Sequence, residues 1–167
     1  FEPMWEQLNR IIKPNGAIVL FGSQPFTSAL IMSNPKKFKY EWIWQKSHAT
    51  GHLNSKKQPM RQHENICVFY NKQCTYNPQM IKKSYIDKRT KSGQDKKHPT
   101  QKPLSLMEYL IRTYTNENEK VLDFTMGSGS TMVACQNTNR NGIGIEQDEK
   151  YFKIAQDRVK ENEYRLF

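Results

Sequence analysis

The stretch from residue 120 to residue 146 limits most strongly what this chain can fold into. An apolar segment (120–124) leads into a turn of small residues, and an amphipathic segment (131–137) follows it. A second apolar segment (142–145) ends on Glu146. Strand, tight turn, helix and strand in this order predict a βαβ unit. The chain is therefore predicted to be an α/β protein.

Three features of this unit predict a site for a nucleoside-bearing cofactor. Gly127 and Gly129 let the backbone adopt a positive φ or let a ligand come close. The N–H groups at the start of the next helix favour an acidic ligand group. The carboxylate of Glu146 is suited to accept hydrogen bonds from ribose hydroxyls. A glycine turn alone would fit simple loop flexibility. The ordered set of strand, Asp123, glycine turn, helix, strand and Glu146 favours a nucleoside-bearing cofactor. A nicotinamide-dependent enzyme, which also uses a glycine turn and a terminal acid, is the alternative enzyme class.

Length and cysteine content predict a single globular domain from a reducing compartment. The chain has 167 residues, enough to bury a sizeable core. Its cysteines, Cys67, Cys74 and Cys135, lack metal-ligand spacing, and their odd number argues against a disulfide framework. We therefore predict a cytoplasmic protein without a metal site, and the sequence has no apolar run long enough to cross a membrane. Because the chain begins at Phe1 rather than methionine, we expect a processed product or a fragment.

The positive charge of the chain is concentrated in one segment. The formal net charge is +10, and residues 46–97 hold twelve Lys and Arg against three acidic residues. This segment therefore carries +9, and the remainder carries +1. A basic segment in a nearly neutral body predicts a polyanion partner, through phosphate neutralisation and counterion release. A solvated, lysine-rich loop is the alternative interpretation.

The other elements alternate between helix and strand, which predicts a layered sheet with right-handed crossovers. Helices are predicted at 2–13 and 26–33, from 103, and from 148 onward; strands are predicted at 17–21, 38–46 and 65–70. The continuous apolar run at 17–21 is typical of a central parallel strand covered on both faces. The helical stripes predicted to be buried are Met4, Leu8, Ile11 and Ile12 in the first helix, Leu104, Met107, Ile111 and Tyr114 in the third, and Phe152, Ala155 and Val159 in the last.

Two short motifs remain ambiguous when each is taken alone. Residues 98–103, His-Pro-Thr-Gln-Lys-Pro, lead into a helix, and their prolines are typical of an ordinary helix start. Tryptophans at alternate positions, Trp42 and Trp44, are usually core residues. Because they stand at the mouth of the basic segment, contact with an unstacked base is the second interpretation. The scattered histidines, including His63, form no metal-ligand pattern.

Together these residues resemble the beta class of S-adenosylmethionine-dependent amino-DNA methyltransferases. In that family HPTQKP before a helix and a following D-P-F-x-G-S-G-T-T form the cofactor pocket. Here the second motif, residues 123–131, is Asp-Phe-Thr-Met-Gly-Ser-Gly-Ser-Thr. Phe124 stands in place of proline, Thr125 in place of the aromatic residue and Ser130 in place of threonine, so the packing beside adenine is expected to differ. The resemblance covers nearly the whole chain, including GAIVLFGSQ and WIWQKS.

The resemblance implies a fold and a division of the chain. The fold would be the Rossmann-like methyltransferase mixed sheet with helices on both faces and a permuted motif order. Residues 1–46 would form part of the catalytic-side sheet, and 47–97 a basic, loop-rich target-recognition insertion with a strand near 65–70. Residues 98–167 would be the S-adenosylmethionine-binding part, all within one structural domain.

The resemblance also implies a function. The protein would be a site-specific DNA methyltransferase that moves a methyl group from S-adenosylmethionine to the exocyclic amine of an adenine or cytosine. The base would be flipped out of double-stranded DNA, because its amine is inaccessible while it is stacked and paired. The setting would be the cytoplasm of a bacterium, or a phage or mobile element. A non-catalytic module that binds the cofactor and DNA, or an RNA methyltransferase, is the alternative.

The resemblance assigns two sets of site residues. Glu146 would bind the ribose, the two glycines would let the cofactor approach, and Thr100, Lys102, Ser128 and Thr131 would lie near its methionine end. The cofactor-binding set comprises His98, Thr100, Gln101, Lys102, Asp123, Thr125, Gly127, Ser128, Gly129, Thr131 and Glu146. The DNA-binding set comprises Trp44, Lys46, Ser47, Lys56, Lys57, Arg61, Lys82, Lys83, Lys88 and Arg89.

One departure from the family pattern concerns catalysis. The family's motif Asp/Asn/Ser-Pro-Pro-Tyr/Phe/Trp normally precedes the region where this chain begins, and the sequence contains no Pro-Pro. The first strands of the sheet are expected to be missing with it, so no catalytic residue is named. We expect the carboxyl-terminal part of a longer or cleaved enzyme, inactive alone, which a missing N-terminal segment or a partner chain completes. A homodimer is a separate possibility. A degenerate binding module is the alternative.

Overall fold

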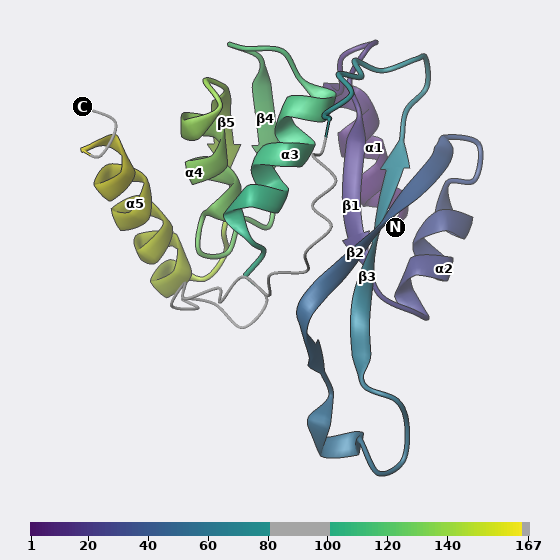
Figure 1. The fold of residues 1–167 in the computed structure, drawn as a ribbon. Coiled ribbons are helices and arrows are strands. Elements are labelled where there is room, and N and C mark those ends of the chain that lie inside the picture. Colours follow the sequence, from purple (N-terminus) through teal and green to yellow (C-terminus); the bar gives the residue numbers. More distant parts are fainter. Residues whose placement is uncertain (81–100, 165–167) are drawn as a thin grey trace. The chain divides into compact units, whose positions relative to one another are not determined.

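The computed structural model describes residues 1–80 and 101–164, which form two compact units (Figure 1). The first unit comprises residues 1–74, and the second begins at Thr75. The boundary between the units lies inside the predicted insertion, residues 47–97. The predicted division of a single domain into residues 1–46, 47–97 and 98–167 stays a prediction. Among the described residues, none of the helices combines the length and the apolar character that a membrane span needs.

The first unit contains a three-stranded antiparallel sheet with the order β1-β3-β2. Its elements are α1 (Glu2–Ile11), β1 (Ile18–Gly22), α2 (Phe26–Ser33), β2 (Phe38–Thr50) and β3 (Arg61–Phe69). The predicted parallel arrangement of the first strand is wrong, because β1 pairs with β3 in the antiparallel direction, from Ile18 opposite Phe69 to Gly22 opposite Asn65. A continuous apolar run indicates that a strand is covered, but it carries no information about the direction of its neighbour.

The core of the first unit joins both helices to the sheet. Trp5 of α1 and Leu30 of α2 cluster with Ile18, Cys67 and Phe69, and Trp5 Nε1 donates a hydrogen bond to Ser33 Oγ at 2.8 Å. Cys67 and Phe69 are two residues apart on β3, so their side chains lie on the same face of the sheet. Both helices therefore cover that one face. The predicted burial of Ile11 is wrong: its side chain is 46% exposed. Trp5, which the predicted stripe left out, moves the centre of that stripe away from Ile11.

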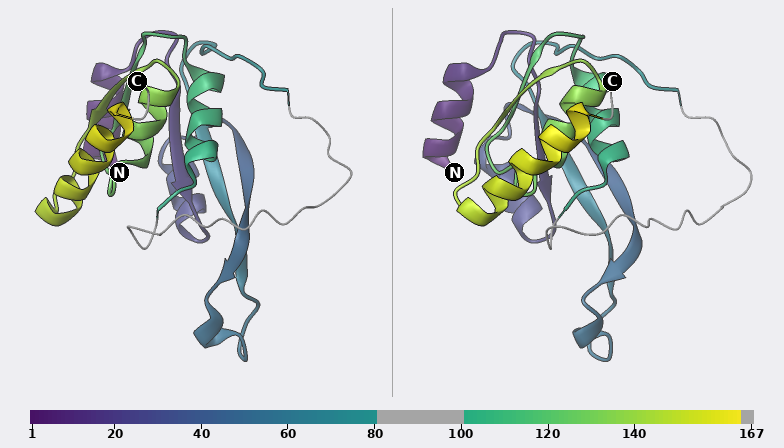
Figure 2. Two further views of the ribbon diagram at one scale, coloured as in Figure 1. Left: turned by 60° about the vertical axis from the view of Figure 1, so that its left-hand side comes forward. Right: turned by 90° about the vertical axis from the view of Figure 1, so that its left-hand side faces the viewer.

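Strands β2 and β3 are longer than predicted and continue beyond the sheet as a two-stranded ribbon (Figures 1 and 2). The ribbon ends in a short 3₁₀ turn, His52–Asn54, which follows Gly51 at φ 91°. The sequence predicted that β2 ends at residue 46, because the residues that follow lack apolar alternation. A ribbon that covers no core does not need that alternation, so its strands leave no periodic signal.

The second unit contains the predicted βαβ unit and two further helices. Its elements are α3 (Leu104–Tyr114), β4 (Lys120–Asp123), α4 (Ser130–Asn137), β5 (Asn141–Gly144) and α5 (Glu149–Glu163). Strands β4 and β5 are parallel, with Asp123 opposite Gly144 at their carboxyl ends, which confirms the prediction. The predicted stripe of α3 is also confirmed, since Ile111 and Tyr114 are buried and Leu104 and Met107 are half-buried.

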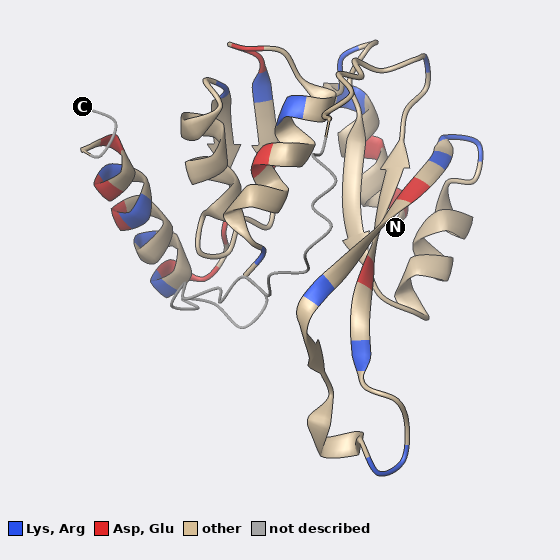
Figure 3. Cartoon of the chain, viewed as in Figure 1, with Lys and Arg blue, Asp and Glu red and all other residues tan. Residues whose placement is uncertain are grey.

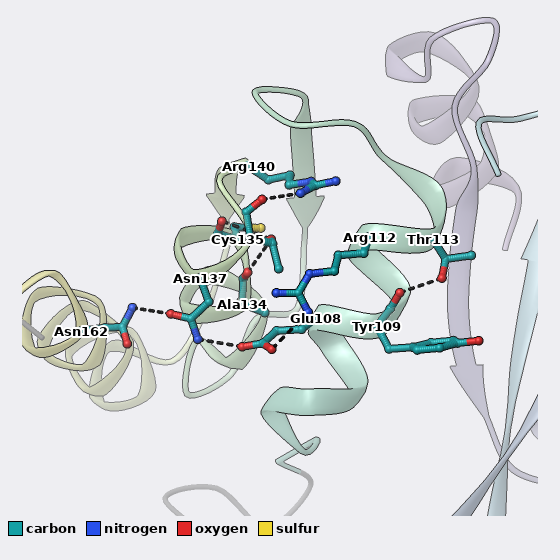
Figure 4. Close-up of polar contacts among 10 residues, drawn as sticks. Glu108, Tyr109, Arg112, Thr113, Ala134, Cys135, Asn137, Arg140 and Asn162 are labelled. Carbon is teal, nitrogen blue, oxygen red and sulfur yellow. Dashed lines mark hydrogen bonds and ion pairs between the residues drawn. The ribbon is translucent and has the colours of Figure 1, made fainter. Parts of the chain in front are cut away.

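The last helix buries less than predicted. Ala155 of α5 is 1% exposed, but Phe152 is 39% exposed, so its predicted burial is wrong. A series of polar side chains attaches this helix to α4, and α4 to α3 (Figure 4). Asn162 Nδ2 donates to Asn137 Oδ1 at 2.9 Å and to Gln136 Oε1 at 3.0 Å, and Asn137 Nδ2 donates to Glu108 Oε1 at 2.7 Å. The orientation of α5 is thus fixed by hydrogen bonds as well as by packing.

Candidate cofactor-binding site

A tight loop, residues 124–129, connects β4 to α4, and we call it the glycine loop. Gly127 and Gly129 have φ values of 53° and 77°, a region that side-chain-bearing residues rarely adopt. A Cβ atom on Gly129 would lie 2.8 Å from the Cβ of Ala155 and 3.1 Å from its Cα. The loop therefore needs glycine at position 129 both for its backbone conformation and for its contact with α5.

Asp123 connects the start of the glycine loop to the first turn of α4 through its carboxylate. One carboxylate oxygen accepts a hydrogen bond from the backbone N–H of Thr125 at 3.0 Å, and the other accepts one from the Thr131 hydroxyl. Thr131 is 6% exposed, at the first turn of α4. Three predicted cofactor residues are thus brought together, and their contacts connect the end of the strand to the beginning of the helix.

Glu146 connects the glycine loop to the residues that follow β5. Its Oε2 accepts a hydrogen bond from Gly127 N–H at 2.8 Å, and its Oε1 accepts one from Asp148 N–H at 2.9 Å. The N–H groups of Asp148, Gly127 and Gln147 lower the pKa of Glu146, and partial desolvation and the charge of Asp148 oppose this shift. Each carboxylate oxygen has a second lone pair, so the ionised group retains capacity for ligand hydroxyls.

The middle of the glycine loop contacts two residues distant in sequence. Ser128, 3% exposed, donates from its hydroxyl to Gln101 Oε1 at 3.3 Å. Arg158 Nη1 of α5 donates to the carbonyl oxygen of Ser128 at 2.5 Å, and lies 3.0 Å from Ser128 Oγ and 3.3 Å from Ser130 Oγ. Arg158 is not among the site residues predicted from the sequence. In the sequence, the one feature that could have indicated Arg158 is its position three residues after Ala155. Residues at this spacing share a face of a helix, and here that face of α5 lies toward the loop.

Three residues of the predicted cofactor set remain: Lys102, His98 and Thr100. Lys102 is half-buried beside Gln101, immediately before α3. His98 and Thr100 lie outside the described residues. The structure therefore links Gln101 with Ser128, Asp123 with Thr125 and Thr131, and Gly127 with Glu146, and the binding role of the set stays a prediction.

The hairpin end of β2 and β3, residues 46–62, carries most of the predicted DNA-binding residues that are described, and we call it the basic ribbon (Figure 3). Lys56, Lys57, Arg61 and Ser47 are exposed on it. Lys46 differs, because its Nζ lies 2.9 Å from Glu64 Oε1 and the two side chains are only 14% and 16% exposed.

Trp44 lies at the base of the basic ribbon. It is half-buried and edge-on to Phe21, with ring centroids 6.5 Å apart. Together with the ion pair of Lys46, this contact attaches the ribbon to the sheet. The other predicted DNA-binding residues, Lys82, Lys83, Lys88 and Arg89, lie outside the described residues.

The three thiols belong to the interior rather than to a reactive site. Cys67, Cys74 and Cys135 are free and buried. Burial, followed by the charge of Asp123, raises the pKa of Cys135 to about 12, while the charge of Arg140 opposes this shift. Within residues 1–80 and 101–164, no group of three His, Cys, Asp or Glu side chains is arranged to hold a metal ion.

A family model decides the classification of the chain. The model of the N6/N4 methyltransferase family, described as DNA methylase, matches residues 1–157. The chain belongs to this family. The resemblance to amino-DNA methyltransferases of the beta class, drawn above from residues 98–103 and 123–131, is confirmed.

Two relatives of this chain come from bacteria. The chain is 28% identical to the type II methyltransferase M.HpaI of Haemophilus parainfluenzae over 95% of its own length and 58% of that protein. It is 29% identical to the type II methyltransferase M2.LlaDCHI of Lactococcus lactis subsp. cremoris, over 95% of its own length and 66% of that protein. The chain thus spans about three fifths to two thirds of the length of these relatives.

Solved structures confirm the predicted fold class. The complex of M1.HpyAVI with S-adenosylmethionine is 33% identical, has a TM-score of 0.76, and is matched over 95% of this chain and 81% of its own. The cytosine-N4-specific PvuII DNA methyltransferase shares the fold, with 17% identity, a TM-score of 0.66, and coverage of 92% of this chain and 71% of its own. The chain is therefore an α/β protein with the Rossmann-like methyltransferase fold.

Proposed function

We propose that this chain takes part in the transfer of a methyl group from S-adenosylmethionine to the exocyclic amine of adenine or cytosine in double-stranded DNA. The observation that carries this proposal is the closed glycine loop, which Asp123 fixes to α4 and Glu146 fixes to the end of β5. The relatives named as methyltransferases, and the related complex with S-adenosylmethionine, support the same chemistry.

The residues present fit this cofactor. The carboxylate of Glu146 has unused lone pairs for ribose hydroxyls. No side-chain cap occupies the N-terminus of α4, so its first N–H groups suit the carboxylate of a methionine moiety. Gly127 and Gly129 present backbone without side chains beside both groups. When bound, the cofactor supplies an activated methyl group on a sulfonium, and the chain's own residues bind and orient it.

The basic ribbon supports a DNA partner. A two-stranded β-ribbon has the dimensions to enter the major groove of B-DNA. Lys56, Lys57 and Arg61 are exposed on this ribbon and suit phosphate contacts. Glu64 already pairs with Lys46, so the exposed charges at the ribbon's end are all positive among residues 47–62. The target base would leave the stack before its amine meets the methyl group.

We also propose that contact with the target amine comes from residues outside 1–167, in the same protein or in a partner chain. The sequence contains no Pro-Pro, and therefore no Asp/Asn/Ser-Pro-Pro-aromatic motif. Supplying a segment with that motif to residues 1–167 should then be required for methyl transfer. The bacterial relatives support a bacterial cytoplasm as the location of this reaction.

The proposed function is tested by cofactor binding and by methyl transfer. Calorimetry should show that S-adenosylmethionine binds and that Glu146→Gln weakens binding by about 1–3 kcal/mol, because charge-assisted hydrogen bonds are lost. NAD is titrated in parallel, and binding of NAD alone would replace the proposal with a nicotinamide-dependent enzyme.

A radiolabelled-methyl assay then compares unmethylated duplex DNA with structured RNA, with and without a segment that carries the Pro-Pro motif. Transfer to DNA only with the segment is the expected result. Selective transfer to RNA would reassign the substrate, and DNA binding without any transfer would indicate a regulatory module.

A further inference from the structure

Arg158 makes an unusual set of contacts for a residue of an amphipathic surface helix. Its Nη1 lies within hydrogen-bond distance of three oxygens on two residues, the carbonyl and hydroxyl of Ser128 and the hydroxyl of Ser130. All three acceptors are neutral, and the side chain is half-buried. Burial lowers the pKa of Arg158, the charge of Glu161 opposes this shift, and an arginine stays protonated in proteins. A cation is therefore held directly against the glycine loop.

Apart from the carboxylate of Glu161, the surroundings of this guanidinium add further positive charge. Ser130 is the first residue of α4, and the N-terminus of a helix carries partial positive charge. A guanidinium beside Ser130 adds a second positive charge at that point. An anionic group bound at the same N-terminus would be attracted by both charges. The charge distribution thus favours a ligand with a carboxylate at this end of the loop.

Attachment of α5 does not by itself require Arg158. Asn162 already binds Asn137 and Gln136 of α4, and Gln136 Nε2 donates to the carbonyl of Val159 at 3.2 Å. Val159 directly follows Arg158 and Asn162 lies one turn beyond it on the same helix, and Figure 4 shows how Asn162 meets Asn137. Ala155, on the other side, packs against Gly129. The helix is held at both flanks, and the guanidinium adds hydrogen bonds to the loop that the packing of Ala155 against Gly129 does not supply.

We propose that Arg158 is a positioning residue of the cofactor site, which holds the glycine loop at Ser128 and Ser130 and attracts the carboxylate of the bound cofactor. The inference rests on the proposed function, because it takes S-adenosylmethionine as the ligand. Arg158 acts through the loop and through its charge, not by contact with the transferred methyl group.

The test compares two variants of Arg158 with a control variant one turn further along α5. Arg158→Met keeps the aliphatic length and removes the charge and the hydrogen bonds, so it should weaken S-adenosylmethionine binding about 10- to 100-fold in calorimetry. Arg158→Lys keeps the charge and should restore part of that loss. Asn162→Ala removes the contacts to α4 one turn away and should leave the dissociation constant unchanged. Thermal unfolding of the free proteins shows whether Arg158→Met and Asn162→Ala destabilise to a similar degree.

The methyl-transfer assay supplies an independent measurement. For Arg158→Met, KM for the cofactor should rise while kcat at saturating cofactor is retained, a separation that general destabilisation does not produce. Equal weakening of binding by Asn162→Ala and Arg158→Met would overturn the inference, because Arg158 would then act only through helix packing. Unchanged binding in Arg158→Met would overturn it as well, while leaving the proposed function intact. A wild-type protein that binds no S-adenosylmethionine would overturn both.

Discussion

The substitution Gly129→Ala tests whether the glycine loop is held by direct contact with α5. The backbone of Gly129 has a φ of 77°, and left-handed conformation costs an alanine about 1–2 kcal/mol relative to glycine. The new methyl group would lie 2.8 Å from the Cβ of Ala155 and 3.1 Å from its Cα. Because the nearest atoms include helix backbone, the overlap is relieved only by moving α5, which costs a further ~1–3 kcal/mol.

These two terms have separate controls in the same chain. Gly51 also has a positive φ, 91°, but a Cβ there would meet nothing within 4 Å, so Gly51→Ala carries the conformational term alone. Ala155→Gly removes the methyl group that Gly129→Ala would strike, and on its own costs about 1 kcal/mol of helix propensity. The double variant should therefore recover part of the steric cost, through a favourable coupling of ~1 kcal/mol or more.

Urea unfolding, monitored by circular dichroism, measures the free energy of unfolding of the wild-type protein, the single variants and the double variant. We expect Gly129→Ala to lose about 2–5 kcal/mol, the sum of the two terms. Additive effects of Gly129→Ala and Ala155→Gly would refute the steric reasoning, because residues in contact should not behave independently. A loss no larger than that of Gly51→Ala would lead to the same conclusion.

Three further predictions concern charge and titration. The pKa of Glu146 is lowered in the folded protein, so its contribution to stability is complete above the ordinary glutamate pKa of about 4.3 and is lost as the pH falls through the lower folded value. In that pH window the free energy of unfolding of Glu146→Gln should fall less steeply with pH than that of the wild-type protein, and identical profiles would contradict this. Lys56→Gln with Lys57→Gln should reduce the slope of log K against log salt for duplex DNA by about 1.8, if each contacts one phosphate; an unchanged slope would favour a solvated ribbon. Cys135, with a pKa raised to about 12, should react with a thiol reagent at pH 8 only after denaturation, and rapid reaction of the native protein would show that it is accessible.

Local periodicity located the helices and strands well, but it carried little information about which strands are neighbours. The helix predicted at 26–33 is confirmed at those limits by α2, because apolar spacing and the flanking prolines act within a few residues. The antiparallel pairing of β1 with β3 joins segments more than forty residues apart, from Ile18 to Phe69. Nothing in the apolar run of β1 distinguishes that pairing from a parallel one.

The candidate site shows the same limit in its side chains. Asp123, Gly127, Thr131 and Glu146 belong to one βαβ unit, so a motif of fixed spacing identifies them together. Arg158 reaches the same loop from the next helix, and no fixed spacing to the motif marks it as a partner of Ser128. The residues that a motif contains are thus accessible to sequence reasoning, whereas the residues that support it depend on packing.

Charge counting has a related limit, because a count does not distinguish paired charges from exposed ones. Lys46 contributes to the net charge of +9 in residues 46–97, but its ion pair with Glu64 leaves both side chains largely buried at the base of the ribbon. Removing Lys46 would leave Glu64 without that partner, at a cost in stability, and would change the phosphate-contacting charge little. Lys56, Lys57 and Arg61 are exposed and have freedom to meet a polyanion. Among the described residues, the electrostatic attraction to DNA is therefore expected to come from the end of the ribbon and not from its base.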